Sequence, residues 1–202
     1  MKKEVGIVDI GYGNIGSVYN AVDYLGFKVK LEKNSKNIKK YSHIILPGVG
    51  SFAKNSELIK KKGWFEALMD FKNNGSYIFG ICIGMQMMFE GGAEGGRNIG
   101  LGFFSGFCEK FKTSVVVPHI GFNTVQHNKT KIWNNIPNNS SFYFVHSYRV
   151  KNTNDNYNYC QTDYGEKFIS FIEKENIFGS QFHPEKSHNS GLKLLQNFLN
   201  LK

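Results

Sequence analysis

Cys82 is the residue of this sequence best placed for nucleophilic chemistry. It is the centre of a glycine-cysteine-glycine pattern at residues 80–84, between an apolar run and a stretch of helical character. This layout is typical of a nucleophile elbow, a strained strand-to-helix turn at which flanking glycines prevent backbone clashes. A helix N-terminus carries partial positive charge, which favours thiolate over thiol. A buried structural cysteine is the alternative, and we assign that role to Cys108 and Cys160, which lack such a setting.

A cysteine nucleophile needs a base, and residues 181–185 contain the strongest candidate. His183 and Glu185 lie two positions apart, and residues two apart point the same way in an extended chain. Glu185 could then fix the tautomer of His183 and stabilise its charged form. Other histidines lack an acid at such spacing. His146 is either a core histidine or part of the site, and we favour the core role for its side chain.

A second glycine pattern, G-x-G-x-x-G at residues 11–16, raises the hypothesis of dinucleotide binding. It follows a predicted strand, and Glu32 lies about 20 residues on, where a ribose-binding acid would stand. Little chain remains, however, for a second mononucleotide half and a substrate domain. We therefore favour a tight turn that lets the first helix pack on the sheet, and we expect no cofactor. The absence of H-E-x-x-H and C-x-x-C patterns predicts no metal site.

Length and composition favour one globular domain over residues 1–202. Hydrophobic residues make up 41% of the chain and charged residues 20%, which argues against disorder. No apolar run approaches the roughly 20 residues of a membrane-spanning helix, and the N-terminus lacks the features of a signal peptide. Three widely spaced cysteines imply no disulfide framework. We expect a cytoplasmic protein without a membrane partner.

The net charge of +9 raises the question of nucleic-acid binding. The lysines are scattered, and the basic stretches at 36–40 and 60–62 lack the interleaved aromatic residues of a stacking platform. We expect a solvated basic face and no nucleic-acid partner. That face could meet an acidic partner or attract an anionic substrate.

The first part of the chain alternates predicted strands and helices. Apolar runs predict strands at 5–10, 28–32, 43–46 and 77–82, and helical spacing predicts helices at 17–25 and around 58–69. This order favours an α/β fold with a mostly parallel sheet flanked by helices. After a glycine-rich loop at 91–96 we expect a small antiparallel extension, with short strands around 107–111, 115–117, 142–150 and 168–173. A helix at 191–201 closes the chain, and the asparagine-rich residues 152–158 predict a surface turn.

Taken in order, these stretches resemble the class I glutamine amidotransferases, most closely the glutaminase subunits of imidazole glycerol phosphate synthases of histidine biosynthesis. The similarity runs nearly end to end through residues 9–14, 46–52, 80–84, 117–123, 142–148, 162–165 and 182–187. It implies the flavodoxin-like fold of that family. It also implies a reaction in which Cys82 attacks the side-chain amide of L-glutamine, ammonia leaves, and water hydrolyses the thioester. His183 would carry the proton, with Glu185 as third member of the triad.

The same resemblance implies roles for further residues. An oxyanion hole would be formed by backbone N–H groups of Ile83, Val49 and Gly50. The glutamine would be held by Gly48, Gly50, Gln86, Glu94, Ser147 and Tyr148. A partner, a (β/α)₈-barrel synthase subunit that receives ammonia through its interior, would form a heterodimer with the chain by contacting Asn14, Tyr143 and Lys186.

Three positions depart from the family pattern. Ile83 stands where leucine is usual, Phe122 where tryptophan is usual, and Ile10 where tyrosine is usual. Phe122 and Ile10 leave open a different partner, an enzyme that amidates a surface-polysaccharide sugar. Two further hypotheses are a cysteine peptidase of similar fold and a binding subunit whose glutaminase site is vestigial.

Overall fold

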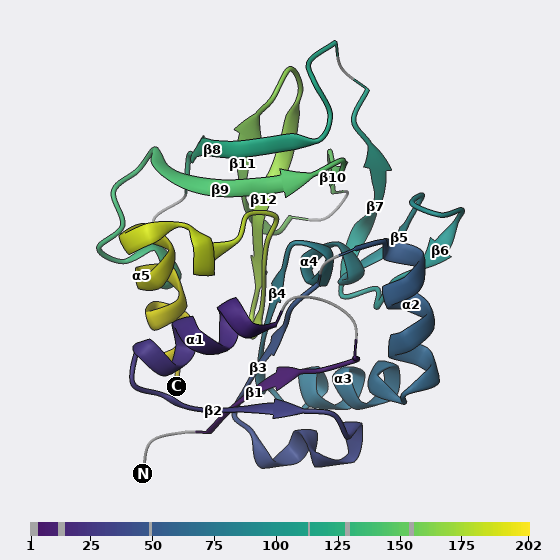
Figure 1. The fold of residues 1–202 in the computed structure, drawn as a ribbon, viewed down its shortest axis with the longest axis vertical. Helices are drawn as coiled ribbons and strands as arrows, with labels where there is room; N and C mark the ends of the chain where they lie inside the picture. Colours follow the sequence, from purple (N-terminus) through teal and green to yellow (C-terminus); the bar gives the residue numbers. More distant parts are fainter. Residues whose placement is uncertain (1–3, 12–14, 49, 113, 128–129, 154–155) are drawn as a thin grey trace.

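The computed structural model describes residues 4–11, 15–48, 50–112, 114–127, 130–153 and 156–202. Its centre is a seven-stranded sheet (Figure 1). Its strands run in the order β2-β1-β3-β4-β13-β12-β11. They span β1 Glu4–Val8, β2 Lys28–Glu32, β3 His43–Leu46, β4 Tyr77–Ile81, β11 Asn158–Asp163, β12 Lys167–Lys174 and β13 Ile177–Ser180. The first five strands in this order pair in parallel, and β12 and β11 are antiparallel additions. The predicted α/β class is therefore confirmed.

Helices cover both faces of the sheet, as the continuous apolar strands require. In Figure 1, α1 and α5 lie on one side of the sheet, and α2 and α3 lie on the other. The helices are α1 Gly16–Tyr24, α2 Phe52–Lys61, α3 Trp64–Asn73, the short α4 Ile83–Met87 and α5 His188–Leu199. Short 3₁₀ turns are η1 Ser35–Lys40, η2 Lys131–Trp133 and η3 Pro184–Lys186. None of the described helices is both long and apolar enough to cross a lipid bilayer.

Two smaller sheets pack beside the carboxyl end of β4. One pairs β8 His119–Val125 with β9 Ser140–His146 in antiparallel fashion. The other has the order β10-β7-β5-β6 and contains β5 Phe89–Gly92, β6 Asn98–Ile99, β7 Phe104–Lys110 and β10 Tyr148–Val150. They bring the carboxyl end of β9 to within hydrogen-bonding range of the residue that follows β4, since Cys82 Sγ lies 3.9 Å from the carbonyl oxygen of Val145.

Several predicted elements were wrong in detail. The predicted helix around 58–69 is two helices, because Gly63 between them adopts a left-handed conformation with φ of 67°. No strand forms at 115–117. The predicted glycine-rich loop begins as strand β5, in which a Cβ on Gly91 would collide with the backbone of Asn98 and one on Gly92 with the ring of Phe52.

The strand order also bears on the dinucleotide hypothesis. The parallel strands follow the order 2-1-3-4, as in flavodoxin-like sheets, rather than the 3-2-1-4 order of dinucleotide-binding sheets. Glu32 is buried, and its carboxylate accepts hydrogen bonds from the Asn34 N–H, the Asn37 amide and the Tyr41 hydroxyl. These contacts leave it poorly placed to bind a ribose, and they disfavour the hypothesis.

Candidate active site

Two neighbouring parallel strands bring the nucleophile and its base together. Cys82 directly follows β4, and His183 follows β13, with Ile81 and Ser180 opposite each other at the carboxyl ends of these strands. Cys82 has φ of 54° and ψ of −109°, a strained conformation for a residue with a side chain. Its N–H donates to the carbonyl of Ser180 at 2.7 Å, which holds the strained turn in place.

The glycines on either side of Cys82 are needed for space. A Cβ on Gly84 would collide with the carbonyl oxygen of Leu46, and a Cβ on Gly80 would come within 2.7 Å of the backbone of Gly84. Gly48 meets the same restriction from the other side, since a Cβ there would lie 2.5 Å from the Gly84 nitrogen. The observed geometry is therefore that of a nucleophile elbow.

His183 and Glu185 form a buried pair. Nδ1 of His183 lies 2.8 Å from Oε1 of Glu185, and their side chains are 5% and 3% exposed. Contrary to our expectation, the backbone between the two residues is not extended, because residues Pro184–Lys186 form the 3₁₀ turn η3. The Ser187 hydroxyl donates to the carbonyl of His183, so the turn itself holds the imidazole beside the carboxylate.

The charge state of His183 follows from its neighbours. Burial alone would lower the pKa of His183, but hydrogen bonds with Cys82 and Glu185, together with the negative charges of both groups, raise this pKa to about 10. His183 is therefore protonated at neutral pH. An imidazolium beside a cysteine generally stabilises the thiolate form.

Cys82 and His183 open on a cavity of about 280 Å³. Most of the residues expected to bind glutamine or to form the oxyanion hole line this cavity. Its wall consists of Gly50, Cys82, Ile83, Gln86, Glu94, Pro118, Val145, His146, Ser147, Tyr148, His183 and Lys186. Gly48 is not part of the wall and packs against the elbow instead. Val49 lies outside the described residues.

Two wall residues are already engaged within the chain. The carboxylate of Glu94 accepts a hydrogen bond of 2.7 Å from the N–H of Phe52, the first residue of α2. The Gln86 amide donates to the carbonyl of Tyr148 at 3.0 Å. Within the described part of the chain, Oε1 of Gln86 is buried and has no hydrogen-bond partner.

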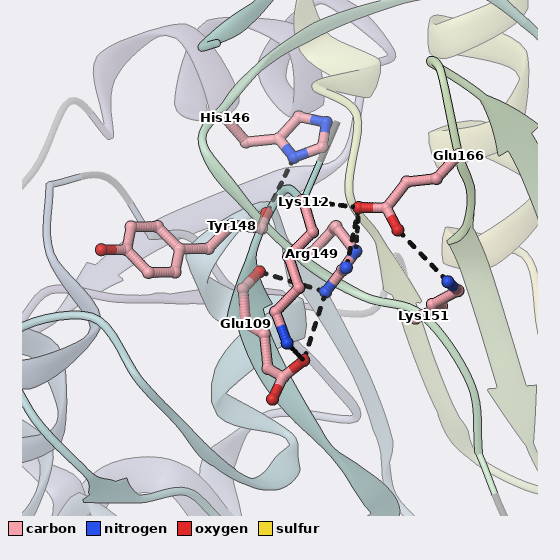
Figure 2. Close-up of polar contacts among 7 residues, drawn as sticks. All are labelled: Glu109, Lys112, His146, Tyr148, Arg149, Lys151 and Glu166. Atoms are coloured by element: carbon pink, nitrogen blue, oxygen red, sulfur yellow. Dashed lines mark hydrogen bonds and ion pairs between the residues drawn. The ribbon is translucent and has the colours of Figure 1, made fainter. Parts of the chain in front are cut away.

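His146 belongs both to the core and to the cavity wall. Its Nδ1 lies 2.8 Å from the carbonyl of Tyr148 (Figure 2), and its Nε2 lies 3.1 Å from Nδ1 of His119. Burial lowers the pKa of His146 to about 3 and the pKa of His119 to about 4. Both rings are therefore neutral at pH 7. His146 donates to the Tyr148 carbonyl, since a carbonyl can only accept.

A buried ion pair anchors the strand that follows. Arg149 is 1% exposed, and its guanidinium donates to Oε1 of Glu166 at 2.7 Å and 3.1 Å (Figure 2). Burial would raise the pKa of Glu166, but the hydrogen bonds from the Lys112 N–H and from Arg149 hold it below its usual value. Glu109 adds a longer ion pair to Arg149 at 3.8 Å. This anchor fixes β10, whose first residue is Tyr148.

Gln181 is a neighbour of the sulfur to which the sequence analysis assigned no role. It is fully buried, and its Nε2 lies 3.7 Å from Sγ of Cys82. Its position two residues before His183 is the signal that could have identified it, by the spacing used for Glu185. For Arg149 and Glu166, no local pattern signals their pairing.

Of the residues expected to face a partner, Lys186 lines the cavity and Tyr143 lies beside Lys186. Lys186 is exposed, and its Nζ lies 5.8 Å from the ring centre of the half-buried Tyr143. Asn14 lies outside the described residues. Across β8 and β9, Ile120 pairs with Val145 and Phe122 with Tyr143. Ile120, Phe122 and Val145 are 59%, 50% and 36% exposed, so one face of this small sheet, the β8–β9 face, is apolar and uncovered.

Comparisons with known proteins show which family the sequence matches. The sequence matches the family described as glutamine amidotransferase class-I over residues 6–201. It is 40% identical over 195 residues to the imidazole glycerol phosphate synthase subunit HisH of Desulfitobacterium hafniense, covering 96% of this chain and 92% of that protein. It is 41% identical to the imidazole glycerol phosphate synthase subunit HisH 1 of Campylobacter jejuni, covering 98% of this chain and all (100%) of that protein.

Solved structures show the same fold at lower identity. The structure of PurLQS from Thermotoga maritima has a TM-score of 0.79 at 20% identity, with 99% of both chains covered. A crystal structure of a glutamine amidotransferase has a TM-score of 0.76 at 17% identity, with 96% of this chain and 97% of that chain covered. By its sequence match and its full-length relatives, the chain belongs to the class I glutamine amidotransferases.

Proposed function

We propose that this protein hydrolyses L-glutamine to glutamate and ammonia, with Cys82, His183 and Glu185 as its catalytic triad. The observation that carries the proposal is a strained cysteine and a protonated, carboxylate-bound histidine that open together on one cavity of about 280 Å³. A nucleophile, a proton carrier and an orienting carboxylate are the parts that acyl transfer requires.

In the first half of the reaction, the Cys82 thiolate attacks the side-chain carbonyl carbon of glutamine. The resulting oxyanion is held by the backbone N–H of Ile83 and by one from residues 48–50, each such donor contributing about 2.7–4 kcal/mol to transition-state stabilisation. The C–N bond breaks as His183 gives its proton to the departing nitrogen, which leaves as ammonia. A γ-glutamyl thioester remains on Cys82.

In the second half, water attacks the thioester carbonyl and His183 takes its proton. The C–S bond then breaks, glutamate leaves, and the thiolate and the imidazolium are restored. Glu185 holds the ring in place throughout. Gln86 and Glu94 line one wall of the cavity, where Glu94 supplies negative charge for the substrate's ammonium group.

We further propose that the ammonia passes to a (β/α)₈-barrel synthase subunit bound as a heterodimer over Tyr143, Lys186 and Asn14. The apolar β8–β9 face supports a docking surface here, because Val145 belongs both to that face and to the cavity wall. The names of the full-length relatives favour imidazole glycerol phosphate synthase of histidine biosynthesis as the complex.

The alternative partner, an enzyme that amidates a surface-polysaccharide sugar, depends on two divergent positions. Phe122 is half exposed on the β8–β9 face, where it can influence the choice of partner, but Ile10 is 5% exposed and belongs to the core. Only Phe122 therefore supports this alternative.

Ammonia release from glutamine, measured alone and with a barrel subunit plus its nucleotide ligand, tests the proposal. We expect hydrolysis that requires Cys82 and is lost in Cys82→Ala. Full activity of that variant, or no hydrolysis under either condition, would contradict the proposal, and the second result would favour a vestigial binding subunit. Cleavage of peptides by the same thiol would favour a cysteine peptidase. Co-purification followed by a coupled assay on candidate acceptors distinguishes the two synthases.

A further inference from the structure

A chain of hydrogen bonds links the cavity wall to the sulfur of Cys82. The Gln86 amide nitrogen donates to the carbonyl of Tyr148 at 3.0 Å and to Oε1 of Gln181 at 3.0 Å. Nε2 of Gln181 then lies 3.7 Å from Sγ of Cys82. The two glutamines are 1% and 0% exposed, so bulk water does not compete for these contacts.

The Tyr148 carbonyl fixes the direction of every bond in this chain. A side-chain amide offers an oxygen that accepts and an NH₂ group that donates, and its neighbours determine which way it faces. Because a carbonyl can only accept, Gln86 must turn its NH₂ group toward Tyr148. The second hydrogen of that group then points at Gln181, whose side-chain oxygen must accept it. The group that Gln181 turns toward the sulfur is therefore its own NH₂.

We propose that Gln181 is a catalytic residue that donates an N–H to the Cys82 thiolate and stabilises it for attack. This inference rests on the proposed glutaminase function and adds a residue to its machinery. A hydrogen bond to the charged form of a group favours that form, and such a bond is stronger in a buried site. His183 transfers a proton during the reaction, whereas Gln181 keeps its hydrogen and only donates a hydrogen bond.

Other titratable groups also act on the sulfur and must be held constant in a test. Those that face it from the neighbouring elements are His183 after β13, His146 at the end of β9, Glu94 after β5, Tyr148 in β10, Glu185 and Lys186 in η3, and Cys108 in β7. A variant of Gln181 leaves all of them in place, so a difference from the wild type reports the amide.

The test is the pH dependence of Cys82 alkylation by iodoacetamide, read by mass spectrometry of the peptide that contains Cys82. In Gln181→Met, which has no donor, we expect the midpoint of alkylation to rise by about one pH unit, the size of one charge-assisted hydrogen bond. We also expect kcat for glutamine to fall about tenfold with KM within about twofold, because Gln181 is not in the cavity wall. In Gln86→Met the midpoint should move less, because Gln181 keeps its donor.

The exposed Gln126 provides a matched control, and Gln126→Met should leave the midpoint unchanged. An unchanged midpoint in a folded Gln181→Met overturns the inference. If that variant does not fold, Gln181→Leu also lacks a donor and adds no charge, and an unchanged midpoint there overturns the inference equally. Alkylation needs no turnover. A midpoint shift without glutamine hydrolysis therefore rejects only the proposed function, and hydrolysis without a shift rejects only the role of Gln181.

Discussion

Replacing Glu185 with glutamine tests the charge arrangement on which the proposed chemistry depends. The substitution keeps the size of the side chain and removes its charge, at a contact of 2.8 Å between two side chains that are 5% and 3% exposed. A hydrogen bond to a charged group contributes about 1.5–3 kcal/mol, and a neutral one roughly half of that. We therefore expect Glu185→Gln to weaken the stabilisation of the imidazolium by about 1.5 kcal/mol, or about one pKa unit.

The pKa of His183, about 10 in the folded protein, should fall by that amount. The sign of the effect on stability follows from linkage. Because the folded-state pKa of His183 lies above its unfolded value of about 6.5, its contribution to stability is complete below that pH and is lost as the pH rises toward 10. In Glu185→Gln this loss should begin at the same pH, which the unfolded state sets, but it should end at lower pH and be smaller in total. The value of kcat should fall at least about tenfold, because the same stabilisation is lost in the transition state.

The assay is an NMR titration of the His183 ring in both proteins, with glutamine hydrolysis measured on the same samples. Glu175→Gln serves as the control, because Glu175 is exposed in the turn between β12 and β13. An unchanged His183 titration together with hydrolysis within about twofold of wild type would refute the assigned role of Glu185.

Three further predictions concern separate parts of the structure. Glu166→Gln removes one partner of the buried Arg149 pair and should lower the free energy of unfolding by about 3 kcal/mol, whereas Glu109→Gln, at a half-exposed carboxylate, should cost under about 1 kcal/mol. Equal urea midpoints for these two variants would contradict the anchor. The pKa of His119 is lowered, so the stability that its neutral ring contributes should be complete above about pH 6.5 and should fall by about 1–3 kcal/mol as the pH falls toward 4. In His119→Asn the unfolding free energy should therefore depend less steeply on pH in that window. An unchanged slope would contradict the assigned burial of a neutral His119. Phe122→Asp should weaken binding of the barrel subunit by at least about tenfold in calorimetry with Cys82 alkylation unaltered, and undiminished binding would exclude the β8–β9 face as the docking surface.

The first half of the fold was predictable because its signals are local. The strands at 28–32 and 43–46 are continuous apolar or alternating runs that end at turn residues, and the structure has them at these bounds. Strands β8 and β11 were missed because their sequences contain glycine, asparagine and aspartate, which disfavour strands. They form because β9 and β12 offer them partners, and pairing between distant segments leaves no short pattern.

In the candidate site, too, the residues in local patterns were predictable and the contacts between distant segments were not. Cys82, His183 and Glu185 lie in two short patterns whose spacing has chemical meaning, and the structure brings them to one place. The orienting contacts around them join residues far apart in sequence, such as Gln86 with Gln181. Such contacts depend on how the sheets stack, which sequence spacing alone does not determine.

The chemistry and the choice of partner therefore rest on separate sets of residues. The sulfur, the imidazole and the amide of Gln181 are buried, and their hydrogen bonds are made within the chain. A substitution there leaves a buried group without its partner, at a cost of about 1–3 kcal/mol. On the β8–β9 face, Phe122 is half exposed, and a substitution there leaves no buried polar group without its partner. Substitutions at surface positions such as Phe122 can therefore change which enzyme receives the ammonia, while the residues of the glutaminase site stay the same.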